Sequence, residues 1–307
     1  MRAQYIILPI LIAISSSLLL ISIVHADGWR PATKAPNHTS VANTGHNLTQ
    51  RYSDMEGFMD QYRNDYNAVC VYCHTPHGAS SEMGSIPLWN RTKSSVTYDL
   101  YSAPTTLGQT ITTPGANSMT CLSCHDGTVA IDSIINMPGP GGYLKAQETS
   151  VNPTFLDSWS GAGPNNGNHS VMFGSTITDC NRCHGTPPMF PSLGMADFSV
   201  FFIETDLRND HPVGVEYPTS LGAGVDFKVP TGLQAGKMSF FDLNANGQAD
   251  TNEIRMYQTG EGYEVECASC HDPHGVPSSA GSGSEFIPSF LRVSNAESAL
   301  CLTCHTK

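Results

Sequence analysis

The cysteines constrain this 307-residue chain more than any other feature of its sequence. All 10 belong to C-x-x-C pairs, and a histidine directly follows each pair. The motifs comprise Cys70, Cys73 and His74; Cys121, Cys124 and His125; Cys180, Cys183 and His184; Cys267, Cys270 and His271; and Cys301, Cys304 and His305. No cysteine is left over for a separate disulfide framework.

Each C-x-x-C-H motif has the spacing of a covalent haem attachment site. On a helical turn the three side chains face one side, so two sulfurs can bond the vinyl groups of one porphyrin while the histidine binds its iron. The alternatives are a thioredoxin-like redox pair, a zinc ribbon and disulfides. Redox pairs rarely occur in fives, and zinc sites do not require a histidine after every pair. The sequence therefore predicts five covalently bound haem c groups.

The first 26 residues have the pattern of an export signal. Arg2 precedes an apolar run from about Ile6 to Val24, and a small-residue ending predicts cleavage after Ala26. The run is nearly long enough to span a bilayer, so an uncleaved anchor is the alternative. Because c-type haem is attached outside the cytoplasm, we expect an exported protein at the cell surface or outside the cell, or alternatively in the periplasm.

The chain is acidic, with 15 Lys and Arg against 27 Asp and Glu and a formal net charge of −12. Haem propionates would add negative charge. Nucleic acid and anionic lipid surfaces are therefore unsuitable partners. Cationic patches, ferric minerals or basic electron carriers fit this charge better.

The histidines outside the motifs are candidates for second axial ligands. His25 leaves with the leader, and His38 is expected to be an exposed histidine. The five distal candidates are His46, His77, His169, His211 and His274. Because their number equals the number of haems, the sequence predicts bis-histidine ligation and low potentials throughout. Methionine ligation, which would raise a potential, is the alternative.

Two distal candidates stand three residues after a motif histidine, in the matching segments CHTPH and CHDPH. His77 and His74 lie on the same side of one porphyrin, so His77 must bind a different iron if it binds iron at all. The same holds for His274 and His271. Each segment is therefore predicted to bind two neighbouring irons. The alternative is a histidine hydrogen-bonded to a haem propionate.

The order of the motifs indicates an internal duplication. Residues 27–136 contain His46, CVYCHTPHG and CLSCH, and residues 196–307 contain His211, CASCHDPHG and CLTCH. Residues 137–195 add His169 and one further haem motif. We expect an N-terminal two-haem unit, a middle one-haem insertion and a C-terminal two-haem unit, joined around one contiguous chain of haems.

Frequent breakers of secondary structure, 28 glycines and 20 prolines, predict a loop-rich fold. We expect a mostly irregular multihaem cytochrome c fold with short helices, few short strands and the haem chain as its core. Helices are predicted at residues 54–69 and 296–305, the second capped by Ser294 or Asn295. Residues 198–204 read as a buried strand, and residues 138–167 and 278–284 as loops.

The segment DLNANGQADTNE, residues 242–253, fits the pattern of an EF-hand calcium loop with Gly247 at the turn. The predicted ligands are Asp242, Asn244, Asn246, Gln248 through its carbonyl, Asp250 and Glu253. Glycine interrupts the preceding segment, which makes it a poor helix, so we expect one structural Ca²⁺ of modest affinity rather than a sensor pair. The alternative is an asparagine-rich turn.

Several segments together resemble bacterial multihaem cytochromes with doubled CXXCH motifs, including subunits of extracellular cytochrome filaments. These segments are HNL at His46, CHTPHG with PLWNR at residues 87–91, CLSCHDGTVA at Cys121, DHPVG at Asp210, CASCHDPHG and CLTCHTK. They are spread over most of the mature chain. The usual pattern has four haems, and this chain departs from it by inserting His169 and CNRCH.

The resemblance implies an electron conduit rather than an enzyme. In filament-forming relatives the haems run end to end, and a histidine of one subunit can complete a haem in the next. Copies of the same chain are therefore expected partners, with His38 or His46 as the crossing histidine, beside other redox proteins or extracellular acceptors. The alternatives are a discrete periplasmic shuttle and a multihaem reductase, although the C-x-x-C-K motif of nitrite reductase-like enzymes is absent.

Overall fold

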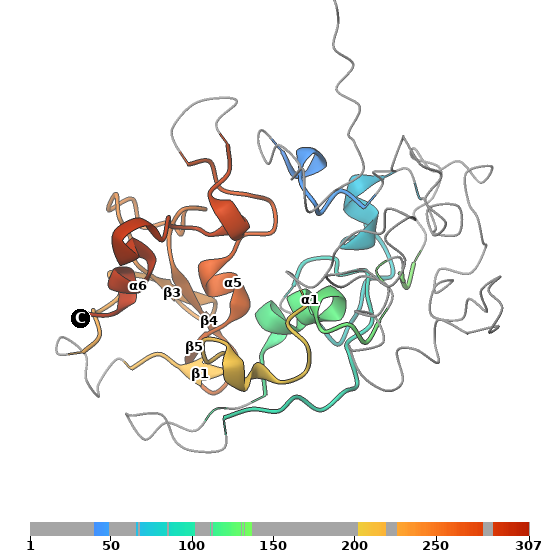
Figure 1. The fold of residues 1–307 in the computed structure, drawn as a ribbon, viewed down its shortest axis with the longest axis horizontal. Coiled ribbons are helices and arrows are strands. Elements are labelled where there is room, and N and C mark those ends of the chain that lie inside the picture. The colour runs from blue at the N-terminus through green and yellow to red at the C-terminus, as the bar shows by residue number, and fades with distance from the viewer. Residues whose placement is uncertain are drawn as a thin grey trace, which may run out of the picture.

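The structure is a computed structural model of the chain (Figure 1). It describes residues 40–48, 66, 68–84, 86–101, 111, 113–129, 131, 133–136, 202–218, 226–278 and 285–306. The predicted leader, His38, His169, the third haem motif and the predicted loop at 138–167 lie outside these residues.

The described helices are short. The longest is α1 (Ala116–His125), and the other α-helices are α5 (Cys267–Cys270) and α6 (Ala299–Cys304). The 3-10 helices are η1 (Val41–Asn43), η2 (Val69–Tyr72), η5 (Leu207–Asn209), η6 (Pro288–Phe290) and η7 (Ala296–Ser298). Helices of this length depend on tertiary packing for their stability. Within the described ranges, none is long and apolar enough to cross a membrane.

A five-stranded antiparallel sheet lies in the C-terminal part, and the sequence reading did not predict it. The spatial order is β1-β5-β4-β3-β2. The strands are β1 (Val215–Glu216), β2 (Gly232–Gln234), β3 (Met238–Phe240), β4 (Arg255–Gln258) and β5 (Tyr263–Val265). Figure 1 shows α5 and α6 beside this sheet and α1 next to α5. The sheet therefore supports two haem motifs.

The helix predicted at residues 296–305 is present but consists of two pieces. Glu297 and Ser298 have positive φ angles of 52° and 62°, which separate η7 from α6. Of the two predicted caps, Ser294 accepts the N–H of Ala296 at 3.2 Å. Asn295 is the N-cap residue of η7 but makes no side-chain cap bond.

Two predicted elements are wrong where the structure describes them. Residues 202–204, at the end of the predicted strand 198–204, are not in a strand, because the N–H groups of Ile203 and Glu204 bond the carbonyl of His125 instead. Near the end of the predicted helix 54–69, Tyr66 and Ala68 are not helical, and Ala68 is extended. The remaining residues of both elements, apart from Val69 in η2, lie outside the described ranges. The predicted loop at 278–284 is described only at Ser278.

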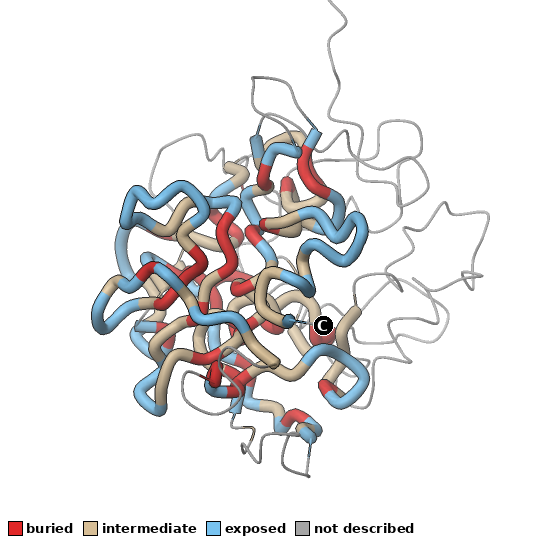
Figure 2. The backbone as a smooth tube through the Cα atoms, turned by 90° about the vertical axis from the view of Figure 1, so that its left-hand side faces the viewer, coloured by how far each residue is buried: buried red, intermediate tan, exposed pale blue. Residues whose placement is uncertain are grey.

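Buried apolar residues of the described chain form three separate clusters, and Figure 2 shows short buried stretches scattered along the backbone. The first cluster contains Trp89 and Leu122 and packs against Cys73. The third lies between the sheet and α6 and packs against Cys270 and Cys304. Cysteines of the haem motifs therefore line two of these clusters.

A buried arginine joins the N-terminal loops to α1. The side chain of Arg91 is 1% exposed. Its nitrogens donate to the hydroxyl and carbonyl oxygens of Ser123 at 3.2 and 2.7 Å, and to the carbonyls of Ile131 and Ser133 at 3.0 and 2.6 Å. Because Ser123 lies between Cys121 and Cys124, these bonds hold the second haem motif in place.

Candidate functional site

Each described C-x-x-C-H motif forms a helical turn. The backbone N–H of His74, His271 and His305 donates to the carbonyl of the first cysteine of its own motif at 2.7, 3.1 and 2.9 Å. The second motif occupies the end of α1. This geometry places both cysteines and the histidine of a motif on one side. All eight described cysteines are free thiols, which argues against disulfides between them.

Cysteines of different motifs are close neighbours. Burial, followed by the charge of a neighbouring cysteine, raises the pKa of Cys73 to about 12. A hydrogen bond with another motif's thiol is the largest cause of the raised pKa of Cys121. The neighbouring pairs are Cys73 with Cys124, Cys121 with Cys267, and Cys270 with Cys301. The first motif therefore lies beside the second, the second beside the fourth, and the fourth beside the fifth.

Three histidines outside the motifs lie beside motif histidines. The distance between ring centres is 6.2 Å for His46 with His125, 6.3 Å for His274 with His74, and 6.5 Å for His211 with His305. Two imidazoles that bind one metal from opposite sides through bonds of about 2 Å have ring centres roughly 6 Å apart. The separations therefore fit one iron between the members of each pair.

The hydrogen bonds of the histidine rings also suit metal ligands. Nδ1 lies within hydrogen-bond distance of a backbone carbonyl in His46 at 2.8 Å, His74 at 3.0 Å, His211 at 3.0 Å and His271 at 2.7 Å. A carbonyl can only accept, so Nδ1 must donate. In the neutral ring this leaves the lone pair on Nε2, the arrangement usual for histidines bound to metal.

The pKa values favour neutral imidazole at one histidine of each pair, whereas the hydrogen bond with Asp272 raises the pKa of His274. Burial is the largest cause that lowers the pKa of His46 to about 4, and the charges of His125 and His274 add to it. Burial also lowers the pKa of His74 and of His305. Metal binding requires the neutral ring, so these environments hold the histidines in their binding form.

Trp89 offers a polar group that suits a haem. Its ring centre lies 5.8 Å from that of His74. Its Nε1 is buried and has no hydrogen-bond partner in the part of the chain that the structure describes. A buried N–H of this kind requires an acceptor. A haem carboxylate beside His74 would supply one.

The other predicted haem residues are not brought together. His77 is exposed, and no described histidine ring lies against it or against His271. The carbonyl of His77 accepts the hydroxyl of Thr75 at 2.9 Å. Motif residues Cys180, Cys183 and His184, and the candidate His169, lie outside the described residues.

The first and fourth motifs share one pattern of hydrogen bonds. In both, the chain returns and pairs with the motif histidine, as His74 pairs with Trp89 and His271 with Leu291. The carbonyl of the second cysteine accepts an N–H at 2.8 Å in each case. The donors are Asn90 for Cys73 and Arg292 for Cys270, so these two residues occupy matching positions.

The predicted calcium loop is closed by its own side chains. Asp242 accepts the N–H of Asn246 at 3.2 Å and of Gly247 at 2.8 Å, and Gly247 has a φ of +75°. Glu253 accepts the N–H groups of Leu243 and Asp250 at 2.7 and 3.0 Å. Asn244 and Asn246 both donate to Asp250, and the N–H of Gln248 donates to Asn246. The donor set consists of oxygens, which Ca²⁺ prefers. In the described ranges, however, no three His, Cys, Asp or Glu side chains group to hold a metal.

We expect the wild-type protein to bind one Ca²⁺ in this loop with a Kd on the order of 10⁻⁴–10⁻³ M, as extracellular sites do. Glu253→Gln removes the ligand at the last loop position and is expected to weaken binding at least about tenfold. Isothermal titration calorimetry measures this change, with the exposed Glu261→Gln as the matched control. Equal affinity in the wild type and Glu253→Gln would place the bound calcium elsewhere.

A buried carboxyl group lies where α1 meets α5. Glu266 is 1% exposed. It accepts the N–H of Gly115 at 2.9 Å and the hydroxyl of Ser118, whose oxygen in turn accepts the N–H of Cys267 at 2.8 Å. Burial is the largest cause that raises the pKa of Glu266 to about 7. The carboxyl group thus bridges the second and fourth haem motifs.

This carboxyl group is expected to make stability depend on pH. Its pKa in the folded chain, about 7, exceeds the ordinary 4.5, so the folded state keeps a proton that the unfolded state has released. The contribution of Glu266 to the free energy of unfolding is therefore complete below pH 4.5. It is lost as pH rises to about 7, a fall of about 3 kcal/mol. Unfolding free energies at pH 4.5 and 8 measure it. Glu266→Gln should remove this difference and exposed Glu297→Gln should retain it; an equal dependence in both variants would contradict the assignment.

Comparisons with known proteins provide no relative. No protein family matches the chain, and no curated protein is significantly similar to it.

Sequence reasoning missed Glu266, Trp89 and the pair Asp272 and Arg292. For the last pair a signal existed, because CHDPH has aspartate where the matching CHTPH has threonine.

Proposed function

We propose that this chain is an exported pentahaem c-type cytochrome that carries electrons along closely spaced bis-histidine haems. The observation that carries the proposal is the set of three histidine pairs at 6.2–6.5 Å. Each pair joins one motif histidine to one histidine from elsewhere in the chain.

The same geometry supports an assignment of ligands for three of the haems. The first haem takes His74 and His274, the second His125 and His46, and the fifth His305 and His211. For the fourth we assign His271 and His77, because the two CHxPH segments would then exchange their second histidines. For the third we assign His184 and His169.

Haem supplies a reversible one-electron iron couple. The chain's own residues anchor it through two sulfurs and orient the axial rings through Nδ1. If histidines hold each iron from both sides, as proposed, no position on iron would be open to a substrate. This argues for electron transfer rather than reductase activity.

The order of the motifs suits a conduit. The cysteine neighbours link the first motif to the second, the second to the fourth and the fourth to the fifth. Haems attached at adjacent cysteines would lie close to one another, which shortens each electron step. A formal net charge of −12 favours basic partners or cationic surfaces at the ends of this path.

Assembly with further copies of the chain is part of the proposal. His46 lies beside His125 of its own chain, so it would have to leave that position to complete a haem in another subunit. Because the five proposed pairs already supply two histidines to every haem, His38 would contact the neighbouring chain without completing one of its haems. Electron microscopy of the purified protein would distinguish filaments from single particles.

Haem content and spin state test the proposed function. We expect five covalent haems per chain by mass spectrometry and absorbance of the denatured protein. EPR of the oxidised protein should show only low-spin ferric haem. Fewer than five haems would reject the cofactor assignment, and a high-spin haem in the wild type would favour a reductase.

A further inference from the structure

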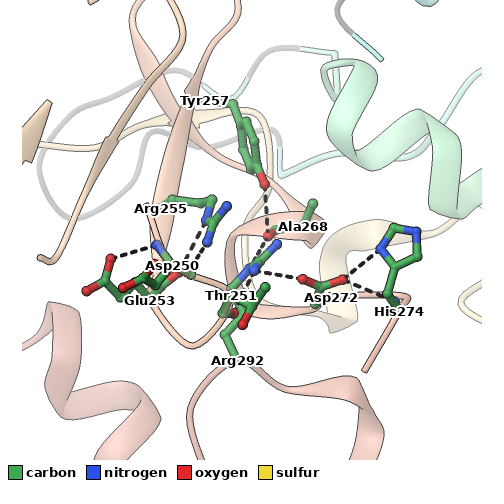
Figure 3. A network of polar contacts seen from close by, with 9 residues as sticks. All are labelled: Asp250, Thr251, Glu253, Arg255, Tyr257, Ala268, Asp272, His274 and Arg292. Atoms are coloured by element: carbon green, nitrogen blue, oxygen red, sulfur yellow. Dashed lines mark hydrogen bonds and ion pairs between the residues drawn. The ribbon is translucent and has the colours of Figure 1, made fainter. Parts of the chain in front are cut away.

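His274 differs from four other described histidines in what its Nδ1 contacts. Four histidines bond a backbone carbonyl, whereas Nδ1 of His274 lies 3.1 Å from the carboxylate oxygen Oδ1 of Asp272 (Figure 3). The same oxygen accepts the backbone N–H of His274 at 3.0 Å. The carboxylate therefore fixes both the backbone and the ring of this histidine.

A buried ion pair holds the carboxylate of Asp272 in place. Asp272 is 7% exposed, and its Oδ2 lies 3.1 Å from Nη1 of Arg292, which is 4% exposed. Arg292 also donates to the carbonyls of Thr251 at 2.8 Å and Ala268 at 3.0 Å. Ala268 belongs to the fourth haem motif, and Thr251 lies in the predicted calcium loop. Figure 3 shows this network reaching from the loop to His274.

The matching half of the chain lacks this charged pair. Thr75 occupies the position of Asp272, and its hydroxyl donates to the carbonyl of His77 rather than to the ring. Asn90 occupies the position of Arg292 and donates to the carbonyl of Val71 at 2.7 Å. The duplicated segments therefore share a backbone and differ in one buried ion pair.

A carboxylate that accepts from Nδ1 raises the basicity of a histidine ligand more than a backbone carbonyl does. It withdraws the Nδ1 proton more strongly and makes Nε2 a more basic donor to the metal. A more basic axial ligand stabilises ferric over ferrous iron and lowers the potential. The nearby guanidinium holds the carboxylate in place and moderates its charge.

We propose that Asp272 is a positioning residue that acts through His274 to lower the potential of the haem attached at Cys70 and Cys73, and that Arg292 fixes its orientation. The haem of His271 and His77, which has Thr75 and Asn90 in the matching places, receives no such effect. This inference rests on the proposed function, because it requires His74 and His274 to share one iron.

Asp272→Asn in the full five-haem protein tests the proposal. We expect one component of a spectroelectrochemical titration to move to higher potential, with its equilibrium constant for reduction at least ten times larger, which is about 59 mV for one electron. Asp272→Glu should largely restore the wild-type value. Thr75→Val, the matched change in the other half, should leave every component in place.

The affected component can be identified independently. His274→Met replaces the ligand itself and should shift the same component further upward. The double variant Asp272→Thr, Arg292→Asn copies the other half without leaving a lone buried charge. It should also shift that component upward and provides the test if Asp272→Asn does not fold.

The outcomes separate the inference from the function on which it rests. Haem content and low-spin EPR can be as expected while neither Asp272→Asn nor the double variant shifts the potential of any component. In that case the inference is overturned and the cytochrome function stands. An equal shift in Thr75→Val would also overturn it. If His274→Met leaves all potentials unchanged, His274 is not an axial ligand and the proposed pairing fails.

Discussion

Replacing His46 with alanine is expected to convert one of five haems from low spin to high spin in a single isolated chain. His46 lies 6.2 Å from His125, its Nδ1 bonds Pro273 and its ring stacks on Phe290 at 4.3 Å. These contacts would hold it as the second ligand of the proposed haem of its own chain. Without the imidazole that iron would have an open axial position. EPR of the oxidised protein measures the change, and the reduced variant should bind carbon monoxide at one haem.

His38→Ala is the matched control for this prediction. In single chains it should leave five low-spin haems, because His38 is not among the five proposed second ligands. If His38→Ala instead produces the high-spin haem in single chains and His46→Ala does not, the pairing of His46 with His125 is wrong.

Replacing Arg91 with methionine is expected to reduce the free energy of unfolding by about 4 kcal/mol. The guanidinium group is buried and makes bonds to oxygens of Ser123, Ile131 and Ser133. Methionine has a similar length but no donor, so these buried oxygens lose their partner. Denaturant unfolding followed by circular dichroism in the haem absorption band measures the loss.

Arg208→Met is the control for Arg91. Its side chain is 51% exposed and pairs with the carboxylate of Asp206 at 2.7 Å. Exposed pairs of this kind contribute little to stability, because water screens them. A loss at Arg91 no larger than that at Arg208 would show that water reaches the oxygens around Arg91.

The sequence predicts the parts of the site that depend on local spacing. The i, i+3 and i+4 positions of the motifs predict helical turns, and each described motif has one. A helix ending at the last motif is also predicted, and the structure has it as η7 and α6. Local spacing further excludes His274 as a second ligand for the haem of His271, and the structure places it beside His74 instead.

The sequence could not predict the features that depend on distant contacts. His274 and His74 are separated by the whole middle of the chain, and no periodicity connects them. The strands of the sheet have only two to four residues, too few for an alternating pattern to be recognised. The segment FSVFFIE is apolar like a buried strand, yet at its end the backbone of Ile203 and Glu204 bonds His125.

The N–H of Ile203 donates to the carbonyl of His125 at 2.8 Å, and this bond marks a place where the chain can lengthen at little energetic cost. It brings together the two ends of the segment that contains the third motif. Because the ends already meet, an insertion there adds only loop-closure entropy, about 0.6 kcal/mol for each doubling of length. Insertion at such a point leaves the contacts of α1, α5 and α6 in place. A chain with four haems could thus acquire a fifth without rebuilding its frame.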